Sequence, residues 1–120
     1  MILKVECVRD LLIAIEKLPG RTAWVPVETL DSDLVDKYSL ETLNYTALLL
    51  SEAGLIEANI TFEGGSVQRM TMQGHEMLDN IRDNRAWRMA KEKASELTSV
   101  SLSNLVDLAN LSVRKLIGLD

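Results

Sequence analysis

Hydrophobic residues recur with helical spacing in the first part of the chain. Between residues 5 and 18 they occupy positions i, i+3, i+4 and i+7, which predicts an amphipathic helix. Pro19-Gly20 should end this helix, because proline lacks an amide hydrogen and clashes with the preceding turn. Residues 31–38 predict one or two further helical turns, with Asp31 or Ser32 as the N-cap.

A better-defined helix is predicted for residues 39–53. Ser39 is a suitable N-cap because its hydroxyl can accept hydrogen bonds from first-turn amides, and Gly54 supplies a left-handed turn after the helix. The apolar stripe that should face the core consists of Leu40, Leu43, Ala47 and Leu50. At about 100° per residue, the opposite face presents Glu41, Tyr45, Leu48, Leu49 and Glu52.

Three short segments have the character of β-strands. Residues 22–28 contain an aromatic residue and two valines, and Pro26 restricts this segment to the edge of a sheet. Residues 55–62 and 67–72 are separated by Glu63-Gly64-Gly65-Ser66. Adjacent glycines supply the positive backbone angles of a tight turn, so we expect a β-hairpin with its tip at residues 63–66.

The rest of the chain predicts three helices. Thr71 is the expected N-cap of the first, a kink or restart is expected near Asp83, and Ser101 should cap the last. The last segment, 102–119, carries ten apolar residues in eighteen, more than one face of a small domain readily covers. A helix enclosed within a monomer is one explanation. We favour a homodimer, with contact residues Leu102, Leu105, Leu108, Leu111 and Leu116.

Composition indicates a single globular domain. The chain has 120 residues, of which 47% are hydrophobic and 26% charged, which excludes a disordered tail. The apolar runs are too short to span a membrane and no signal-peptide pattern is present, so we expect a cytoplasmic location. One cysteine, Cys7, and one histidine, His75, give neither a disulfide nor a zinc cluster. No metal, cofactor or catalytic residue is expected. Trp87 is expected to anchor the C-terminal helices on the rest of the fold, and Trp24 to pack in the core or at the sheet edge.

The charge distribution bears on possible partners. The formal net charge is -5, and residues 28–63 hold eight acids against one base, Lys37. This is the wrong sign for a non-specific nucleic-acid binder. The only basic cluster alternates with acids around a predicted helix, so we expect a self-paired, solvated surface there instead of a phosphate track. That cluster consists of Arg82, Arg85, Arg88, Lys91 and Lys93.

The order of predicted elements is that of an α+β winged helix-turn-helix, with three helices, a wing sheet of two to three strands, and additional C-terminal helices. We expect residues 1–73 to form the winged-helix core and residues 74–120 a helical extension packed on it, in one structural domain. Thr71-x-x-Gly74-x-x-x-Leu78 is similar to the turn with which many winged-helix regulators leave the wing.

Three stretches also carry a resemblance to a known family: Val8–Glu16, Asn44–Ile56, and Thr71–Asp83 with Trp87. They resemble a family of bacterial and prophage proteins that is known only as a domain of unknown function and is grouped with winged helices. In that family the tyrosine at the position of Tyr45 is commonly followed by histidine, whereas Thr46 stands here. The resemblance implies a fold and no mechanism.

Two functions are compatible with this fold. The first is a DNA-binding or transcription-regulatory accessory protein, acting on double-stranded DNA. Its contact residues would be Thr42, Tyr45, Thr46, Gly64, Gly65, Gln68 and Arg69. The second is a scaffold that binds another protein through the acidic and apolar face of the 39–53 helix, since that face carries no Lys or Arg. Its contact residues would be Tyr45, Leu49 and Glu52.

Overall fold

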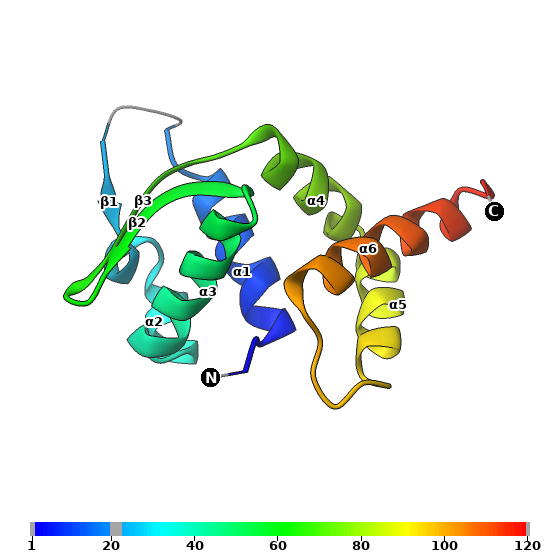
Figure 1. Cartoon of the computed structure of the whole chain (residues 1–120). Coiled ribbons are helices and arrows are strands. Elements are labelled where there is room, and N and C mark those ends of the chain that lie inside the picture. Colours follow the sequence, from blue (N-terminus) through cyan, green and yellow to red (C-terminus); the bar gives the residue numbers. More distant parts are fainter. Residues whose placement is uncertain (1, 20–22, 120) are drawn as a thin grey trace.

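The computed structural model describes residues 2–19 and 23–119, and this part of the chain forms an α+β fold (Figure 1). A small antiparallel sheet lies at one end of the molecule, and the C-terminal helices lie at the other. The elements in chain order are α1 (Val5–Glu16), β1 (Val25–Pro26), the 3-10 helix η1 (Val27–Thr29), α2 (Ser32–Lys37), α3 (Leu40–Glu52), β2 (Ile56–Thr61), β3 (Gly64–Met70), α4 (Met72–Arg82), α5 (Asn84–Ala94) and α6 (Leu102–Leu116).

The sheet has the strand order β1-β3-β2, with both pairings antiparallel. β1 lies at the edge, with Val25 opposite Val67, and this confirms the edge position expected from Pro26. β2 and β3 form the expected hairpin, but its tip differs from the prediction. Thr61 is paired with Gly64, so residues 62–63 make the turn and both glycines belong to β3.

α1 lies at the centre of the fold and packs against α3, α4 and β3. Four of its side chains are completely buried: Cys7, Val8, Leu11 and Leu12. The buried cluster extends without a break from these residues through Leu78 and Ile81 of α4 to Leu105 and Ala109 of α6. The C-terminal helices therefore share one hydrophobic core with the sheet and the first three helices.

Five helices begin at the capping residues that the sequence indicates, whereas α1 begins after Lys4 without a side-chain cap. In each of these five a side-chain oxygen accepts a hydrogen bond from a backbone N–H in the first turn, as N-caps do. The caps are Asp31, Ser39, Thr71, Asp83 and Ser101. The expected restart is confirmed too, because α4 ends at Arg82 and Asp83 begins α5.

One expectation about packing is wrong. Leu40 is 44% exposed because it lies in the first turn of α3, above the opening between that helix and the sheet. Trp24 is 50% exposed and lies just before the edge strand, so of its two expected environments it has that of the sheet edge, and Trp87 is buried as expected. An edge strand has no neighbour on its outer side, so a side chain next to it gains little cover.

Part of the early sequence prediction lies outside the described residues, namely Gly20 and the strand start at Thr22. The first helix ends at Glu16, two residues before its predicted end. No helix within residues 2–19 and 23–119 is long and apolar enough to cross a membrane.

Candidate functional site

The exposed face of α3 is flanked by two hollows. Leu40 and Asn44 lie on the side of the β2–β3 hairpin, and Tyr45 and Leu49 lie on the side of the segment before α6. At about 100° per residue, Glu41, Leu48 and Glu52 lie between these two sides. All three are exposed. We refer to Glu41, Leu48 and Glu52 as the α3 ridge.

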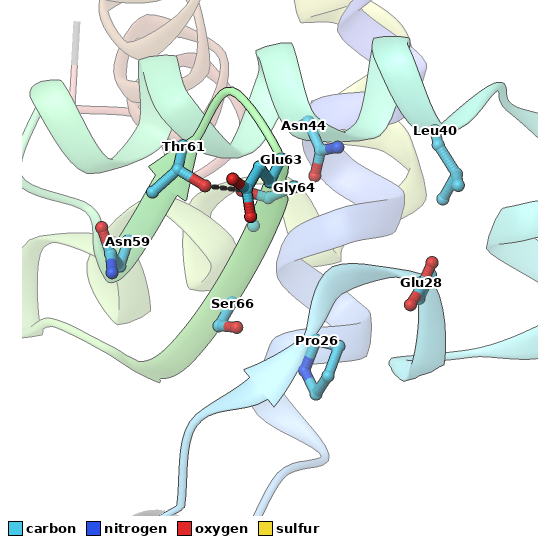
Figure 2. Close-up of a pocket in the computed structure, with 10 residues that line it drawn as sticks. Pro26, Glu28, Leu40, Asn44, Asn59, Thr61, Glu63, Gly64 and Ser66 are labelled. Carbon is cyan, nitrogen blue, oxygen red and sulfur yellow. Dashed lines mark hydrogen bonds between the residues drawn. The ribbon is translucent and has the colours of Figure 1, made fainter.

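The first hollow is a cleft of about 330 Å³ between α3, η1 and the hairpin. Figure 2 shows Asn44 and Leu40 reaching toward it from α3, with Glu63 and Thr61 on the hairpin and Pro26 and Glu28 below. We refer to it as the hairpin cleft. Its lining residues are Pro26, Glu28, Leu40, Asn44, Asn59, Thr61, Glu63, Gly64, Gly65 and Ser66.

Gly65 lets the hairpin lie directly against α3. A Cβ at this position would lie 3.0 Å from Oδ1 of Asn44 and would overlap with Cδ1 of Ile60. Gly64 has a φ of 141°, which side-chain-bearing residues rarely adopt. Gly64 thus allows the backbone angle with which β3 begins, and Gly65 allows β3 to pack closely on α3. For this reason both glycines belong to the strand, and the turn lies before them.

An amide oxygen at the wall of the hairpin cleft has no partner. Oδ1 of Asn44 is buried and accepts no hydrogen bond within the described part of the chain. Most buried polar atoms in folded proteins are hydrogen-bonded, and leaving one unpaired costs about 1–3 kcal/mol. This oxygen therefore gains stability from any donor that reaches it.

The charges around the hairpin cleft are acidic. Glu28 and Glu63 are exposed and form no ion pair among the described residues. Residues 23–70 contain two bases against eight acids. Both bases are held within the chain, Lys37 by Asp10 at 2.9 Å and Arg69 by Glu57 at 2.8 Å. The surface therefore offers hydrogen-bond acceptors and negative charge.

The residues predicted to contact DNA do not form one surface. Thr42 and Thr46 are buried, at 6% and 1% exposure, so their side chains are not available to a partner. At about 100° per residue Thr42 lies next to the exposed face of α3, but the side of the helix that carries both threonines is covered by the fold. Thr46 instead donates a hydrogen bond to the carbonyl of Thr42. This is a correction to the prediction.

The remaining predicted DNA contacts are dispersed. Arg69 lies near the base of the hairpin, beside the end of α1, and pairs with Glu57 across the sheet. Gly64 and Gly65 line the hairpin cleft, and Gln68 lies where the register of β2 and β3 shifts. Tyr45 faces the other flank of α3. No surface of clustered bases results.

The residues predicted to contact a protein do lie together. Tyr45, Leu49 and Glu52 line the second hollow, a groove of about 530 Å³ that also includes Ile2, Leu3 and residues 99–102. Tyr45 and Leu49 are half-buried, and Leu49 packs against the core. Of these three residues only Glu52 is well exposed, so the ridge supplies most of the free surface.

The predicted homodimer face is smaller than expected. Leu102 and Leu105 are buried within the chain's own core, at 9% and 0% exposure, which corrects their assignment as contact residues. Leu108 is half-buried, and Leu111 and Leu116 are exposed. α6 packs on α4 and α5 while its end projects outward, so its exposed leucines lie in the later turns (Figure 1).

Four of the five residues of the basic cluster are paired as the sequence indicates, whereas Arg88 is exposed and has no ion pair among the described residues. Arg82 binds Glu16 and Asp79, Arg85 binds Asp83, and Lys91 binds Glu6. Lys93 lies 3.8 Å from Glu96. The charged groups of Arg9 and Lys91 lie 5.6 and 5.8 Å from the ring centre of Trp87, and the Arg9 contact joins α1 to α5.

Cys7 and His75, the thiol and the imidazole of this chain, lie on different helices. Cys7 is buried in α1, and its burial raises the pKa of the thiol, which suits a packing role. His75 is exposed in the first turn of α4. Within the described ranges no group of three or more His, Cys, Asp or Glu side chains is placed to hold a metal ion.

Of the residues that line the hairpin cleft, only Gly64 and Gly65 are predicted from the sequence as contact residues. Phe62 is fully exposed at the hairpin tip, and a large aromatic residue beside two glycines is a signal that could have been used. Asn44 gave no such signal, because its position against Gly65 depends on how α3 and β3 meet.

Comparison with known proteins places the chain in a family. Residues 3–101 match the family model described as "Hypothetical protein (DUF2513)". The chain is also 33% identical over 119 residues to an uncharacterized protein of Haemophilus influenzae, covering 94% of this chain and 96% of that protein. No solved structure matches the chain significantly. The match spans both the sheet and most of the helices, and the chain therefore belongs to the DUF2513 family.

Proposed function

We propose that this protein is a winged-helix module that binds another protein through the α3 ridge and the adjoining hairpin. The order of elements supports the winged-helix assignment: a helix, an edge strand, two helices and a β-hairpin follow one another, and the first strand pairs with the last. In such a fold the third helix and the wing form the usual recognition surface. Here these elements are α3 and the β2–β3 hairpin.

The single observation that carries the choice of partner is the charge of this surface. The two bases of residues 23–70 are both engaged in ion pairs, while Glu28, Glu41, Glu52 and Glu63 are exposed. DNA binding depends on Lys and Arg contacts to phosphate, and carboxylates at those positions repel it. Leu48 and Phe62 add exposed apolar surface, which suits a protein partner.

A DNA-binding regulator is the competing proposal, and the strand order favours it because many winged helices use this arrangement on duplex DNA. It is tested by fluorescence anisotropy of a mixed-sequence duplex titrated with the protein at low salt. We expect no binding, because the surface lacks free bases. Binding that weakens steeply with added salt would overturn the proposed protein-binding function.

The protein-binding proposal itself is tested by site-specific photo-crosslinking in cells. A photoreactive phenylalanine derivative replaces Leu48 on the α3 ridge, and in a control it replaces Glu96, which is exposed after α5. We expect a distinct protein adduct from position 48 and none from position 96. Equal adducts at both positions, or no protein adduct at position 48, would count against the proposal.

A homodimer through α6 remains a second, independent proposal. It is supported by the exposure of Leu111, Leu116 and Ile117 on the projecting end of the helix. A two-fold dimer through this end would leave the α3 ridge of each copy free, because the ridge lies on a different part of the molecule (Figure 1).

A further inference from the structure

We propose that the hairpin cleft is a binding site for a guanidinium group, the head of an arginine side chain presented by the protein partner. This inference rests on the proposed function and names the chemistry that the partner must carry. It follows from the acceptors that line the cleft, from its size, and from the exposed apolar residues in or next to its lining.

The cleft presents acceptors from different directions. Glu28 and Glu63 contribute unpaired carboxylates from η1 and from the hairpin turn. Asn44 contributes an amide from α3, and its buried Oδ1 has no hydrogen-bond partner within the described residues. No Lys or Arg lines the cleft. A cation that also donates hydrogen bonds would satisfy the charge and, once the Asn44 side chain turns toward the cleft, the unpaired oxygen.

The shape of the site favours guanidinium over a metal ion. Metal sites need several carboxylate, imidazole or thiolate ligands around one point, and no such group of three is found in the described parts of the chain. Guanidinium carries five N–H donors in a planar fork and can reach acceptors on separate walls. The cleft volume of about 330 Å³ has room for this group and part of its alkyl stem.

Two exposed apolar residues, one in the cleft lining and one next to a lining residue in the sequence, favour an arginine within a polypeptide over a free small molecule. Phe62 follows the lining residue Thr61 and is fully exposed, and Leu40 on the opposite wall is 44% exposed. Burial of such apolar side chains is favourable, at roughly 25 cal/mol per Å² removed from water. A partner segment that covers Phe62 and Leu40 while its arginine enters the cleft would use both features.

The test is an NMR titration of the ¹⁵N-labelled full chain with N-acetyl-L-arginine amide. We expect saturable shifts concentrated at the backbone amides of Asn44, Gly64, Gly65 and Ser66. N-acetyl-L-citrulline amide has nearly the same shape without the charge, and it should produce no saturable shift. Arginine shifts spread over the acidic surface without saturation would overturn the inference. Equal affinity for the lysine analogue would overturn the assignment to guanidinium.

Variants then locate the site. Glu28→Gln and Glu63→Gln should each weaken the arginine analogue about two- to fivefold, the range for exposed charge pairs. Glu52→Gln removes an equal charge from α3 outside the cleft and should leave the affinity unchanged. An equal loss in all three variants would show general charge attraction and contradict the inference.

A second variant tests the unpaired oxygen. Asn44→Ala should weaken the arginine analogue without lowering the melting temperature, since in the free chain Oδ1 has no partner to lose. Unchanged affinity would remove Asn44 from the site and overturn its role. If the arginine analogue fails to bind while position 48 still forms its protein adduct, the guanidinium inference falls and the proposed function stands. If the arginine analogue does not bind and position 48 forms no protein adduct, both the guanidinium inference and the proposed function are wrong.

Discussion

The backbone carbonyl oxygen of Leu55 occupies the space that a Cβ on Gly74 would need. A Cβ built at Gly74 would approach this oxygen well inside the 3.0 Å that real Cβ atoms keep. The same carbonyl accepts a hydrogen bond from the N–H of Thr71, at 3.0 Å. The start of α4 is therefore locked onto the start of β2, and the glycine in Thr71-x-x-Gly74 has a steric cause.

Gly74→Ala should destabilise the protein by about 3 kcal/mol, because the clash is with the main chain, which cannot rotate away. Gly118→Ala is the matched control. Gly118 has a φ of 76° with open space around it, so only backbone strain of about 1 kcal/mol applies. Urea unfolding followed by circular dichroism measures both. Equal losses would contradict the steric account.

The buried hydroxyl of Tyr38 donates a hydrogen bond of 2.8 Å to Oδ2 of Asp10, which also binds Lys37. Tyr38→Phe should lower the free energy of unfolding by about 1–2 kcal/mol, since a bond to a charged acceptor is lost. Tyr45→Phe removes a hydroxyl with no hydrogen bond in the described part of the chain and should change stability by less than about 0.5 kcal/mol.

Burial, followed by the bond to Asp10, raises the pKa of Tyr38 above its ordinary value of 10.0. A raised pKa in the folded state means that this contribution is fully present below pH 10.0 and is lost as the pH rises above it. Thermal melting at increasing alkaline pH should show a fall in stability, and Tyr38→Phe should make that fall shallower. An identical fall in the variant would assign it to other groups.

Acid should destabilise the junction of α4 and α5. The Arg85 guanidinium, followed by the N–H groups of Arg85 and Ala86, lowers the pKa of Asp83 from 3.8 to about 2. Arg82 lowers the pKa of Glu16 by hydrogen bonding. With depressed pKa values in the folded state, both contributions are complete above the unfolded values and are lost as the pH falls. For Asp83 this window runs from 3.8 to about 2.

Asp83→Asn isolates the effect, because asparagine retains the N-cap and removes the titration. We expect the melting temperature of this variant to fall less between pH 4 and pH 2 than that of the wild type. Glu92→Gln changes an exposed acid on α5 that has no ion pair among the described residues and serves as the control. A variant that keeps the full wild-type slope would exclude Asp83 as the cause.

The oligomeric state can be tested with substitutions at the projecting end of α6. If the homodimer proposal holds, Leu111→Ser combined with Ile117→Ser should convert a dimer to a monomer, because both exposed side chains would lie in the interface. Light scattering after size exclusion gives the mass, and circular dichroism checks that the fold is retained. A monomeric wild type at high concentration would rule the dimer out.

Most of the fold could be predicted from local sequence patterns. Helix caps such as Ser39 and Asp83 act within three residues of themselves, so their roles are readable without tertiary information. The apolar stripe of α1 and the edge position of Pro26 can likewise be predicted from a few neighbouring residues. The order of these elements then predicted an α+β fold with a hairpin after the third helix, which the structure confirms.

The candidate site was harder to predict, because burial depends on what packs against each face. Thr42 and Thr46 are polar residues next to the predicted exposed face, yet the fold covers them. Leu40 belongs to the apolar stripe of α3, but no core residue of the described chain covers it and it remains exposed. Helical periodicity gives the direction of a side chain from its own axis and says nothing about the neighbour it meets.

The sequence by itself determined where the five capped helices begin and that the first half of the chain is acidic, because capping, periodicity and charge are local properties. Only the tertiary structure decided that Gly65 brings the hairpin against Asn44, that a cleft of acceptors forms between them, and that Leu102 and Leu105 belong to the chain's own core. These features arise from contacts between elements distant in sequence, and close packing at each contact sets what remains exposed.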